Sequence, residues 1–423
     1  MQKLKDSKIA IIGLGYVGLP LAVEFSKKYP TIGFDINKNR VSDLNTGNDS
    51  TFEVDNESLS KALDSGLELS YDIGSIKFSN IFIVTVPTPI DENKAPDLKP
   101  LKKASEMLGA ILKKGDVVIY ESTTYPGCTE EFCVPILESS SKLLYNEDFF
   151  CGYSPERINP GDKKNTLTKI IKVTSGSNPE IALFIDDLYK SIIEIGTHQA
   201  PSIKVAEASK AIENAQRDVN ISFVNELSLI FDRLEIDTLE VLEAASTKWN
   251  FLNYIPGLVG GHCIGVDPYY LAHKAQTVGY EPQVILSGRR VNDSMGIHVA
   301  NTYIKLLVSK NITVKNSKAL ILGITFKEDC PDIRNTKVVD VVNELKEFQI
   351  EVDVFDPNAN RGEVQKQLGI SLLNGLPEFK KYDGIIFAVA HKEFLSFNLR
   401  STPDQVLYDL KGVYSKKLVD KRL

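Results

Sequence analysis

One pattern occurs twice in this sequence and restricts the possible folds more than any other feature. In each copy a short β-branched run ends near a glycine, a helical segment follows, and a second apolar run ends in aspartate. The first copy contains KIAIIGLG and TIGFDIN, with Asp35, and the second contains KALILGITF and IEVDVFDP, with Asp356. Apolar strands that alternate with helices indicate a parallel sheet covered on both faces. The sequence therefore predicts an α/β fold with two Rossmann-like, doubly wound parallel-sheet domains.

The segment between the two copies has the periodicity of a helix. From about Ile203 to Glu235, apolar side chains recur at steps of three, four and seven residues, as on one helical face. These positions are Ile212, Val219, Phe223, Leu227, Ile230 and Leu234. We expect a long central helix that connects the two sheet domains and forms the contact of a homodimer. The predicted domains are residues 1–200, a central helical domain at 201–310, and residues 311–423.

Length, charge and composition exclude several classes of protein. The chain has 423 residues, too many for one ordinary core, and its net charge of −7 offers no broad basic surface to a nucleic acid. No run approaches the roughly 18 apolar residues of a membrane span, and no cleavable leader is expected at the N-terminus. Five cysteines without a C-x-x-C pair argue against a disulfide scaffold or a metal site. We expect a cytoplasmic protein without metal, nucleic-acid or membrane partners.

The first copy of the repeated pattern carries a dinucleotide fingerprint. Gly13, Gly15 and Gly18 form G-x-G-x-x-G between a buried strand and a helix, and Asp35 ends the next strand. The glycines permit a tight turn, an approach of the pyrophosphate and close helix packing, while the helix N-terminus attracts phosphate. A carboxylate at Asp35 can bind the ribose hydroxyls and repels a 2′-phosphate. The motif therefore predicts NAD rather than NADP.

The segment YIPGLVGGHCIGVDPYYL is the most unusual in the chain. Four glycines lie within nine residues around Cys263, and Asp267 follows four residues later. Glycines at this density let a ligand approach the backbone and leave a thiol accessible. The ordinary interpretation of a cysteine is that it is buried and inert. Packing alone, however, does not call for so many glycines beside such a cysteine. Beside a redox cofactor, the thiol suggests oxidation past an aldehyde, through a thiohemiacetal and a thioester.

Three motifs together resemble the UDP-glucose/GDP-mannose dehydrogenase family over essentially the whole chain: GLGYVGLP, GGHCIGVDP and GITFKEDCPDIRNT. Within it, SPERINPGD and GLVGGHCIGVDPYYL resemble the branch that acts on UDP-N-acetylhexosamines for surface polysaccharides. The resemblance implies an NAD-dependent, four-electron oxidation of the C6 hydroxyl of UDP-GlcNAc or UDP-GalNAc to the uronic acid. It also implies that the first domain binds NAD, the central domain carries the catalytic cysteine, and the last binds the UDP-sugar.

The resemblance assigns catalytic roles to matching residues. It implies that Cys263 is the nucleophile, and that Lys210 and Asn214 stabilise the oxyanion. Their spacing of four residues agrees with this, because both lie on one helical face. By the same resemblance Asp267 orders a water, and Glu156 assists thioester hydrolysis as a general base.

Further contacts follow from the same resemblance. Thr123 supplies a hydroxyl near the water, Lys327 contacts the diphosphate of the nucleotide sugar, and Arg334 reaches NAD. Arg157 is our candidate for a polar contact to the sugar. The remaining expected cofactor contacts are Gly13, Gly15, Tyr16, Val17, Gly18, Asp35, Arg40, Thr85, Thr88 and Thr123. The remaining expected substrate contacts are Glu156, Lys210, Asn214, Tyr254, Gly257 and Gly260.

Some positions depart from the family pattern. UDP-glucose enzymes carry a second glutamate where this chain has Pro160, and a lysine where it has Val266. The arginine that a neighbouring subunit donates has no clear match, and Lys248 is only a nearby candidate. These departures favour an N-acetylhexosamine over glucose. Alternatives are UDP-ManNAc or another nucleotide sugar, a two-electron hydroxy-acid dehydrogenase, and a non-catalytic nucleotide sensor.

Overall fold

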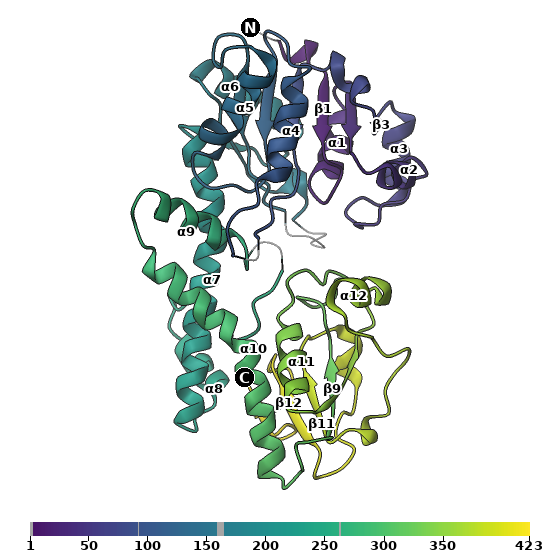
Figure 1. The fold of residues 1–423 in the computed structure, drawn as a ribbon, viewed down its shortest axis with the longest axis vertical. Helices are drawn as coiled ribbons and strands as arrows, with labels where there is room; N and C mark the ends of the chain where they lie inside the picture. The colour runs from purple at the N-terminus through teal and green to yellow at the C-terminus, as the bar shows by residue number, and fades with distance from the viewer. Residues whose placement is uncertain (1–2, 92, 159–164, 262–263) are drawn as a thin grey trace. The chain divides into compact units, whose positions relative to one another are not determined.

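The computed structural model describes residues 3–91, 93–158, 165–261 and 264–423 (Figure 1). The chain forms two compact units, one of Met1–Glu213 with Tyr269–Tyr280 and one of Asn214–Pro268 with Glu281–Leu423. Each unit contains one large parallel sheet, and the predicted α/β fold with two doubly wound sheets is confirmed. Among the described residues, no helix is both long and apolar enough to span a bilayer.

The first unit is built on a six-stranded parallel sheet in the order β3-β2-β1-β4-β5-β6. Its strands are β1 (Ile9–Ile12), β2 (Thr31–Phe34), β3 (Glu68–Ser70), β4 (Ile81–Val84), β5 (Val117–Tyr120) and β6 (Phe150–Tyr153). Alternate side chains of a strand point to opposite faces, so β1 contributes Ile9 and Ile11 to one apolar core and Ala10 and Ile12 to another. Both faces are therefore buried, which explains the continuous apolar runs in the sequence.

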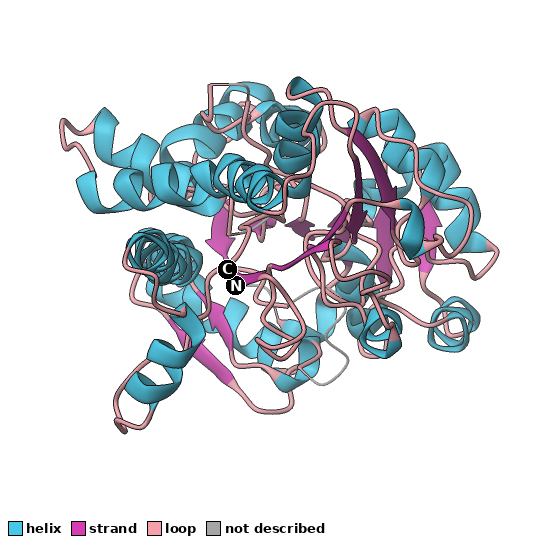
Figure 2. Cartoon of the chain, turned by 90° about the horizontal axis from the view of Figure 1, so that it is seen from below, coloured by secondary structure: helices cyan, strands magenta, loops and turns pink. Residues whose placement is uncertain are grey.

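Helices cover both faces of this sheet (Figure 2). One core includes α1 (Gly18–Ser26), α3 (Asn56–Asp64) and α6 (Pro179–Lys190), and the other includes α4 (Lys99–Gly109) and α5 (Val134–Ser141). The remaining elements of the unit are α2 (Lys38–Asn45), α9 (Asp267–Thr277), a small parallel pair of β7 (Lys172–Thr174) and β8 (Thr197–Gln199), a π-helical turn at Thr129–Cys133, and 3-10 turns at Leu4–Asp6, Ile73–Phe78 and Leu167–Lys169.

The second unit repeats this architecture with a five-stranded parallel sheet in the order β10-β9-β11-β12-β13. Its strands are β9 (Lys318–Leu322), β10 (Glu351–Phe355), β11 (Gly384–Phe387), β12 (Val406–Asp409) and β13 (Lys421–Arg422). Its helices are α8 (Thr238–Ser246), α10 (Gln283–Ser309), α11 (Val338–Glu347) and α12 (Arg361–Leu368), with 3-10 turns at Phe379–Lys381 and Lys392–Ser396. Ala319 and Ile321 of β9 face a core with α10 and α11, while Leu320 and Leu322 face Phe394 on the other side.

The long helix α7 (Ile203–Arg233) runs from the first unit into the second and confirms the helix predicted from Ile203 to Glu235. The distribution of polar and apolar side chains on α7 is the reverse of that on an ordinary surface helix. The buried side chains on one face are mostly polar, namely Glu207, Lys210, Asn214, Asp218, Ser222, Asn225 and Ser228. Most of the apolar positions identified from the periodicity are exposed, namely Ile212, Phe223, Ile230 and Leu234.

The repeated glycine–aspartate pattern has the same geometry in both units. Gly13 and Gly323 follow the first strand of each copy with φ of +99° and +95°. Asp35 Oδ2 accepts a hydrogen bond from the Leu14 N–H at 2.8 Å, and Asp356 Oδ2 accepts one from the Ile324 N–H at 2.7 Å. In both copies the second carboxylate oxygen accepts the N–H of the residue two positions later, at 2.8 Å. The aspartate thus fixes the glycine turn of its own unit.

Candidate active site

The residues expected to bind the cofactor lie at the carboxyl edge of the first sheet. Gly13 follows β1, Asp35 follows β2, Thr85 follows β4, Thr123 follows β5 and Glu156 follows β6. Because these strands are parallel neighbours, their carboxyl ends meet at one edge, the usual place for a ligand in such a sheet. The fold therefore brings five of the predicted site residues together.

The glycine turn after β1 has room for a phosphate group. At Gly18 an added Cβ would lie 1.8 Å from the Gly13 carbonyl oxygen, so this position requires glycine for packing. At Gly15, which is exposed, an added Cβ meets no atom within 4 Å. Helix α1 begins at Gly18, and Val17 before it makes no side-chain cap. Leu19 donates its N–H to the Gly15 carbonyl at 3.2 Å and Pro20 has no N–H, so of these first three residues Gly18 keeps its N–H for an anion. With Tyr16 completing the turn, this geometry fits a dinucleotide pyrophosphate.

The side chains around this turn divide into two groups. Asp35 is half-buried and each of its oxygens accepts a single backbone N–H, which leaves acceptor capacity for ribose hydroxyls. Arg40 instead braces the turn, because its Nε donates to the Leu14 carbonyl at 2.9 Å and its Nη2 to Asp49 at 2.7 Å. Thr85 Oγ1 likewise donates to the Gly13 carbonyl at 2.8 Å.

Thr88 is anchored by helix α9. Its side chain is buried, and its carbonyl oxygen accepts the hydroxyl of Tyr270 at 2.8 Å. Thr123, in contrast, is only half-buried, after β5. The loop after β4 is therefore fixed by packing, while Thr123 remains accessible at the sheet edge.

The Glu156 side chain accepts hydrogen bonds from three donors. Its Oε1 accepts the N–H groups of Arg157 and Ile158, both at 2.6 Å, and its Oε2 accepts Lys172 Nζ at 3.0 Å. Lys172 is completely buried and also donates to Glu121 at 2.6 Å. Two charge-assisted backbone bonds and a lysine hold this carboxylate in one position.

The inner face of α7 carries the two residues expected to stabilise the oxyanion. Lys210 and Asn214 lie one turn apart and are nearly buried. Asn214 Nδ2 donates to Asp267 Oδ2 at 2.5 Å, so two predicted catalytic residues from distant parts of the sequence are in contact. In the first unit, Arg157 forms an ion pair of 2.8 Å with Glu213, the residue that precedes Asn214. Arg157 therefore ties the Glu156 loop to α7.

The glycine-rich segment is held to the second unit at several points. Asn225 on α7 accepts the Gly257 N–H at 2.8 Å and donates to the Gly257 carbonyl at 3.1 Å. Added Cβ atoms at Gly260 and Gly261 would lie 2.8 Å from the Asn335 carbonyl oxygen and from the Phe326 ring. Two of the glycines are thus required by packing, which corrects our expectation that packing does not call for them.

At Gly257, by contrast, the space beside the backbone is open, and Tyr254 before it is half-buried. Cys263, His262 and Pro160 lie outside the described residues.

The loop after β9 places the two cations predicted in the second unit. Lys327 is half-buried, with its Nζ 5.6 Å from the centre of the Phe326 ring. Arg334 forms a bidentate ion pair with Asp332, with Nη2 at 2.6 Å from Oδ2. Arg334 Nε and Nη2 thus bind Asp332 within their own loop.

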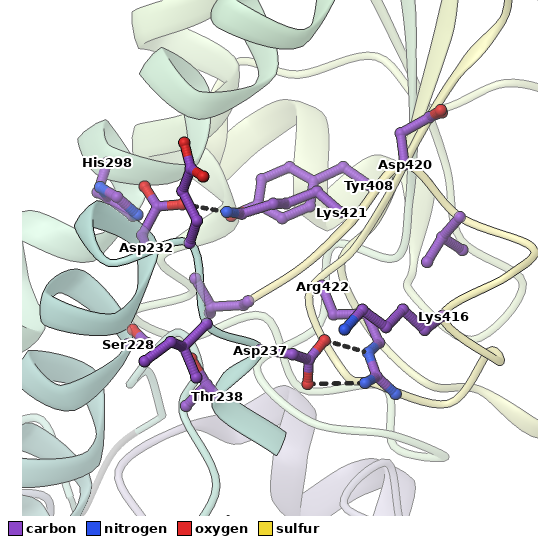
Figure 3. A pocket seen from close by; sticks show the side chains of 14 residues that line it. Ser228, Asp232, Asp237, Thr238, His298, Tyr408, Lys416, Asp420, Lys421 and Arg422 are labelled. Atoms are coloured by element: carbon purple, nitrogen blue, oxygen red, sulfur yellow. Dashed lines mark hydrogen bonds and ion pairs between the residues drawn. The ribbon is translucent and has the colours of Figure 1, made fainter. Parts of the chain in front are cut away.

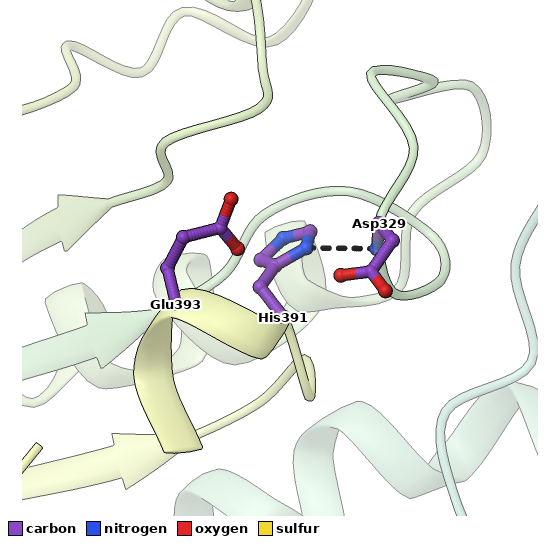
Figure 4. Close-up of side chains that lie close together, drawn as sticks. All are labelled: Asp329, His391 and Glu393. Carbon is purple, nitrogen blue, oxygen red and sulfur yellow. Dashed lines mark hydrogen bonds between the residues drawn. The ribbon is translucent and has the colours of Figure 1, made fainter. Parts of the chain in front are cut away.

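Beside this loop lies a cluster of possible metal ligands, two of which are joined by a hydrogen bond (Figure 4). It contains Asp329, His391 and Glu393, whose ligand atoms lie within 4.8 Å of one another. His391 is buried, and its Nδ1 accepts the Asp329 N–H at 3.0 Å while its Nε2 lies 3.1 Å from Asp356 Oδ2. Burial alone would raise the pKa of Asp356, but the contacts with His391 and the backbone lower it below its usual value. Both ring nitrogens are engaged, so the imidazole shapes the loop that carries Lys327.

A hollow of about 430 Å³ lies where the C-terminal strand meets the end of α7 (Figure 3). The cations that line it are paired: Lys421 binds Asp232, Arg422 binds Asp237 with its closer contact at 2.7 Å, and Lys416 binds Glu240 at 3.0 Å. The pairs of Lys421 and Arg422 fasten β13 to the last turn of α7 and to the N-cap of α8. The hollow offers no free cation pair to a diphosphate among the residues seen to line it.

The sequence motifs did not identify Lys172, Glu121 or Asn225. Two signals were available: Lys172 interrupts the apolar run IIKVTSG, and Asn225 follows Asn214 by eleven residues, which is three helical turns. Neither signal reveals the partner, because the partners are far apart in the sequence.

Comparisons with known proteins identify the family of this chain. Three models of the UDP-glucose/GDP-mannose dehydrogenase family match successive regions: the NAD binding domain at 7–193, the central domain at 204–294 and the UDP binding domain at 320–416. UDP-N-acetyl-D-glucosamine 6-dehydrogenase of Pseudomonas aeruginosa is 57% identical over 99% of this chain and 100% of that protein. The protein of the same name from Salmonella typhi is 54% identical over 99% of each. The solved UDP-D-ManNAc dehydrogenase of Pyrococcus horikoshii has a TM-score of 0.89 at 29% identity, over 98% of each chain.

Proposed function

This chain belongs to the UDP-glucose/GDP-mannose dehydrogenase family, and from that premise we propose that it oxidises C6 of UDP-N-acetyl-D-glucosamine to the uronic acid with NAD. The observation that carries the choice of sugar is the 57% identity, over the full length, to an enzyme named for this substrate. UDP-GalNAc differs only at C4 and stays the second substrate to test. We propose that the product enters surface polysaccharide synthesis.

The cofactor would be held by the turn from Gly13 to Gly18 and by Asp35. NAD supplies the hydride acceptor in each of the two oxidations. The chain's own residues then position the sugar: Lys327 binds its diphosphate, while Tyr254, Gly257 and Gly260 border the sugar beside the catalytic segment.

We assign the oxyanion contacts to α7. Cys263 adds to the aldehyde, and Lys210 and Asn214 donate to the resulting oxyanion. Asp267 accepts one of the two Nδ2 protons of Asn214, which leaves the other free to point at the substrate. In the last step, Glu156 accepts a proton from the water that attacks the thioester, and Thr123 helps to place that water.

A substrate screen tests this proposal directly. Purified enzyme with NAD is given UDP-GlcNAc, UDP-GalNAc, UDP-ManNAc or UDP-glucose, and NADH is counted per sugar consumed. We expect UDP-GlcNAc to give the highest kcat/KM and two NADH per sugar. Cys263→Ala should abolish formation of the acid, whereas Cys133→Ala, at a buried cysteine, is the matched control. One NADH per sugar, or full turnover by Cys263→Ala, would contradict the proposal.

We also propose that the enzyme is a homodimer formed through α7. The exposed apolar side chains on this helix support it, because two copies of the same face can cover each other around a two-fold axis. Phe223→Lys should convert a dimer into a monomer in light-scattering measurements, while Lys204→Glu, at a polar exposed position of the helix, should not. NAD and the UDP-sugar are charged diphosphates that do not cross a bilayer unaided, so we place the reaction in the cytoplasm. We propose no nucleic-acid or membrane partner.

A further inference from the structure

A buried ionic cluster lies directly behind Glu156. Lys172 Nζ is 2.6 Å from Glu121 Oε2 and 3.0 Å from Glu156 Oε2, so one ammonium group bridges two carboxylates. Tyr189 on α6 donates its hydroxyl to the other oxygen of Glu121. Glu121, Lys172 and Tyr189 are essentially inaccessible to water, whereas Glu156 lies at the sheet edge with a small exposed fraction.

The charges of this cluster do not balance. It contains one lysine and two carboxylates, and an unpaired buried charge is costly. Burial raises the pKa of Glu121 to about 7, although Lys172 partly opposes that rise. Burial alone would lower the pKa of Lys172, but the two carboxylates raise it above its ordinary value. The cluster therefore accepts one additional proton near neutral pH.

The donors decide which carboxylate takes that proton. Glu156 accepts three hydrogen bonds, two of them from backbone N–H groups that cannot turn away. Glu121 accepts from Lys172 and Tyr189, and a phenol can also accept a hydrogen bond if the carboxyl group becomes protonated. Glu121 is consequently the better site for a stored proton.

We propose that Lys172 and Glu121 form a proton relay behind Glu156, in which Lys172 positions that carboxylate and Glu121 stores the proton released during thioester hydrolysis. This rests on the proposed function, which makes Glu156 the base of that step. Water forms a C–O bond to the thioester carbon, the C–S bond breaks, and the cysteine leaves as a thiolate. The water proton passes to Glu156. Lys172 gives one of its own protons to Glu121, and the neutral amine that results accepts the proton from Glu156. The proton returns along the same path to solvent after product release.

If the relay operates, loss of Glu121 should slow hydrolysis of the thioester and leave the two oxidations unchanged. Glu121→Gln preserves the shape of the side chain but cannot store a proton. We expect stopped-flow measurements to show two NADH formed per active site at an unchanged rate, followed by hydrolysis that is slower by about tenfold to a hundredfold. Intact mass of the quenched variant should show the uronyl adduct on Cys263.

The pH dependence gives a second readout. Glu121 can receive a proton only as a carboxylate, so hydrolysis by the wild-type enzyme should accelerate as the pH rises through about 7. The groups that face Glu121 are Lys172 from β7, Tyr189 from α6 and Glu156 from the loop after β6. Glu121→Gln should lack this dependence. Tyr189→Phe removes one donor to the carboxylate, so it should move the dependence to higher pH even if Glu121→Gln fails to fold.

Glu207→Gln is the matched control. Glu207 is also a buried carboxyl group of the first unit whose pKa burial raises to about 7, but its donors are Gly127 and Thr129. We expect it to change NADH formation and hydrolysis by the same factor. Equal slowing of both steps in Glu121→Gln, with two NADH per sugar in the wild type, would overturn the relay alone. A wild-type enzyme that forms no NADH with any UDP-sugar would overturn the proposed function and the relay together.

Discussion

Replacement of Asn225 by alanine should loosen the catalytic glycine segment. The Asn225 amide is completely buried and makes three hydrogen bonds, two to the Gly257 backbone and one of 2.8 Å to Asn292 Oδ1. The two backbone bonds contribute about 1 kcal/mol each, and an unpaired buried Asn292 oxygen costs about 1–3 kcal/mol more. Asn225→Ala should therefore lower the free energy of unfolding by about 3–5 kcal/mol.

Urea unfolding, followed by circular dichroism, measures this loss. The control is Ser228→Ala on the same buried face, whose hydroxyl donates to the Asn225 carbonyl within the helix at 2.7 Å. The control should lose less than about 1 kcal/mol. In the folded variant kcat should fall while the affinity for NAD stays the same, because the first unit is untouched. Equal losses of unfolding free energy in Asn225→Ala and Ser228→Ala would refute the conclusion that Asn225 holds the Gly257 backbone in place.

Three further predictions follow from packing, charge and thiol accessibility. Gly18→Ala should lower the Tm because the new methyl group meets backbone, whereas Gly15→Ala should keep the Tm and weaken NAD binding in titration calorimetry. The buried Asp218–Arg289 pair, 2.6 Å apart, should show coupling in a double-mutant cycle of Asp218→Ala and Arg289→Met, with each single change costing about 3 kcal/mol and the double change less than their sum. Thiol titration of native enzyme should find one fast-reacting group, which is absent in Cys263→Ala, because the other cysteines are buried.

The fold could be predicted because its signals are local in the sequence. Strand runs that end in glycine or aspartate identified both sheets, and the apolar period located α7 to within two residues of its end. The carboxyl edge then followed from parallel topology, which places Thr123 and Glu156 at the same edge of the sheet as the glycine turn.

The buried face of α7 and the contacts of Lys172 could not be predicted, because both depend on residues far away in the sequence. The period of α7 defines an apolar face but does not say which face is buried, since Asp218 and Asn225 find partners about 70 residues later. Lys172 is an isolated lysine in the sequence until β7 and the loop after β6 bring it to Glu156. Buried polar clusters of this kind are determined by the tertiary fold rather than by local pattern.

The matching positions of Asp35 and Asp356 have a consequence for motif-based searches. A search for glycine turns followed by a strand-end aspartate would count two dinucleotide sites in this chain. In the second copy, however, Asp356 Oδ2 accepts from the Ile324 and Thr325 N–H groups and also contacts His391, so its capacity is used. The half-buried Asp35 keeps that capacity. The His391 imidazole and the additional backbone donors at Thr325 and Ala359 thus use, in the second copy, the acceptor capacity that Asp35 keeps for a ribose.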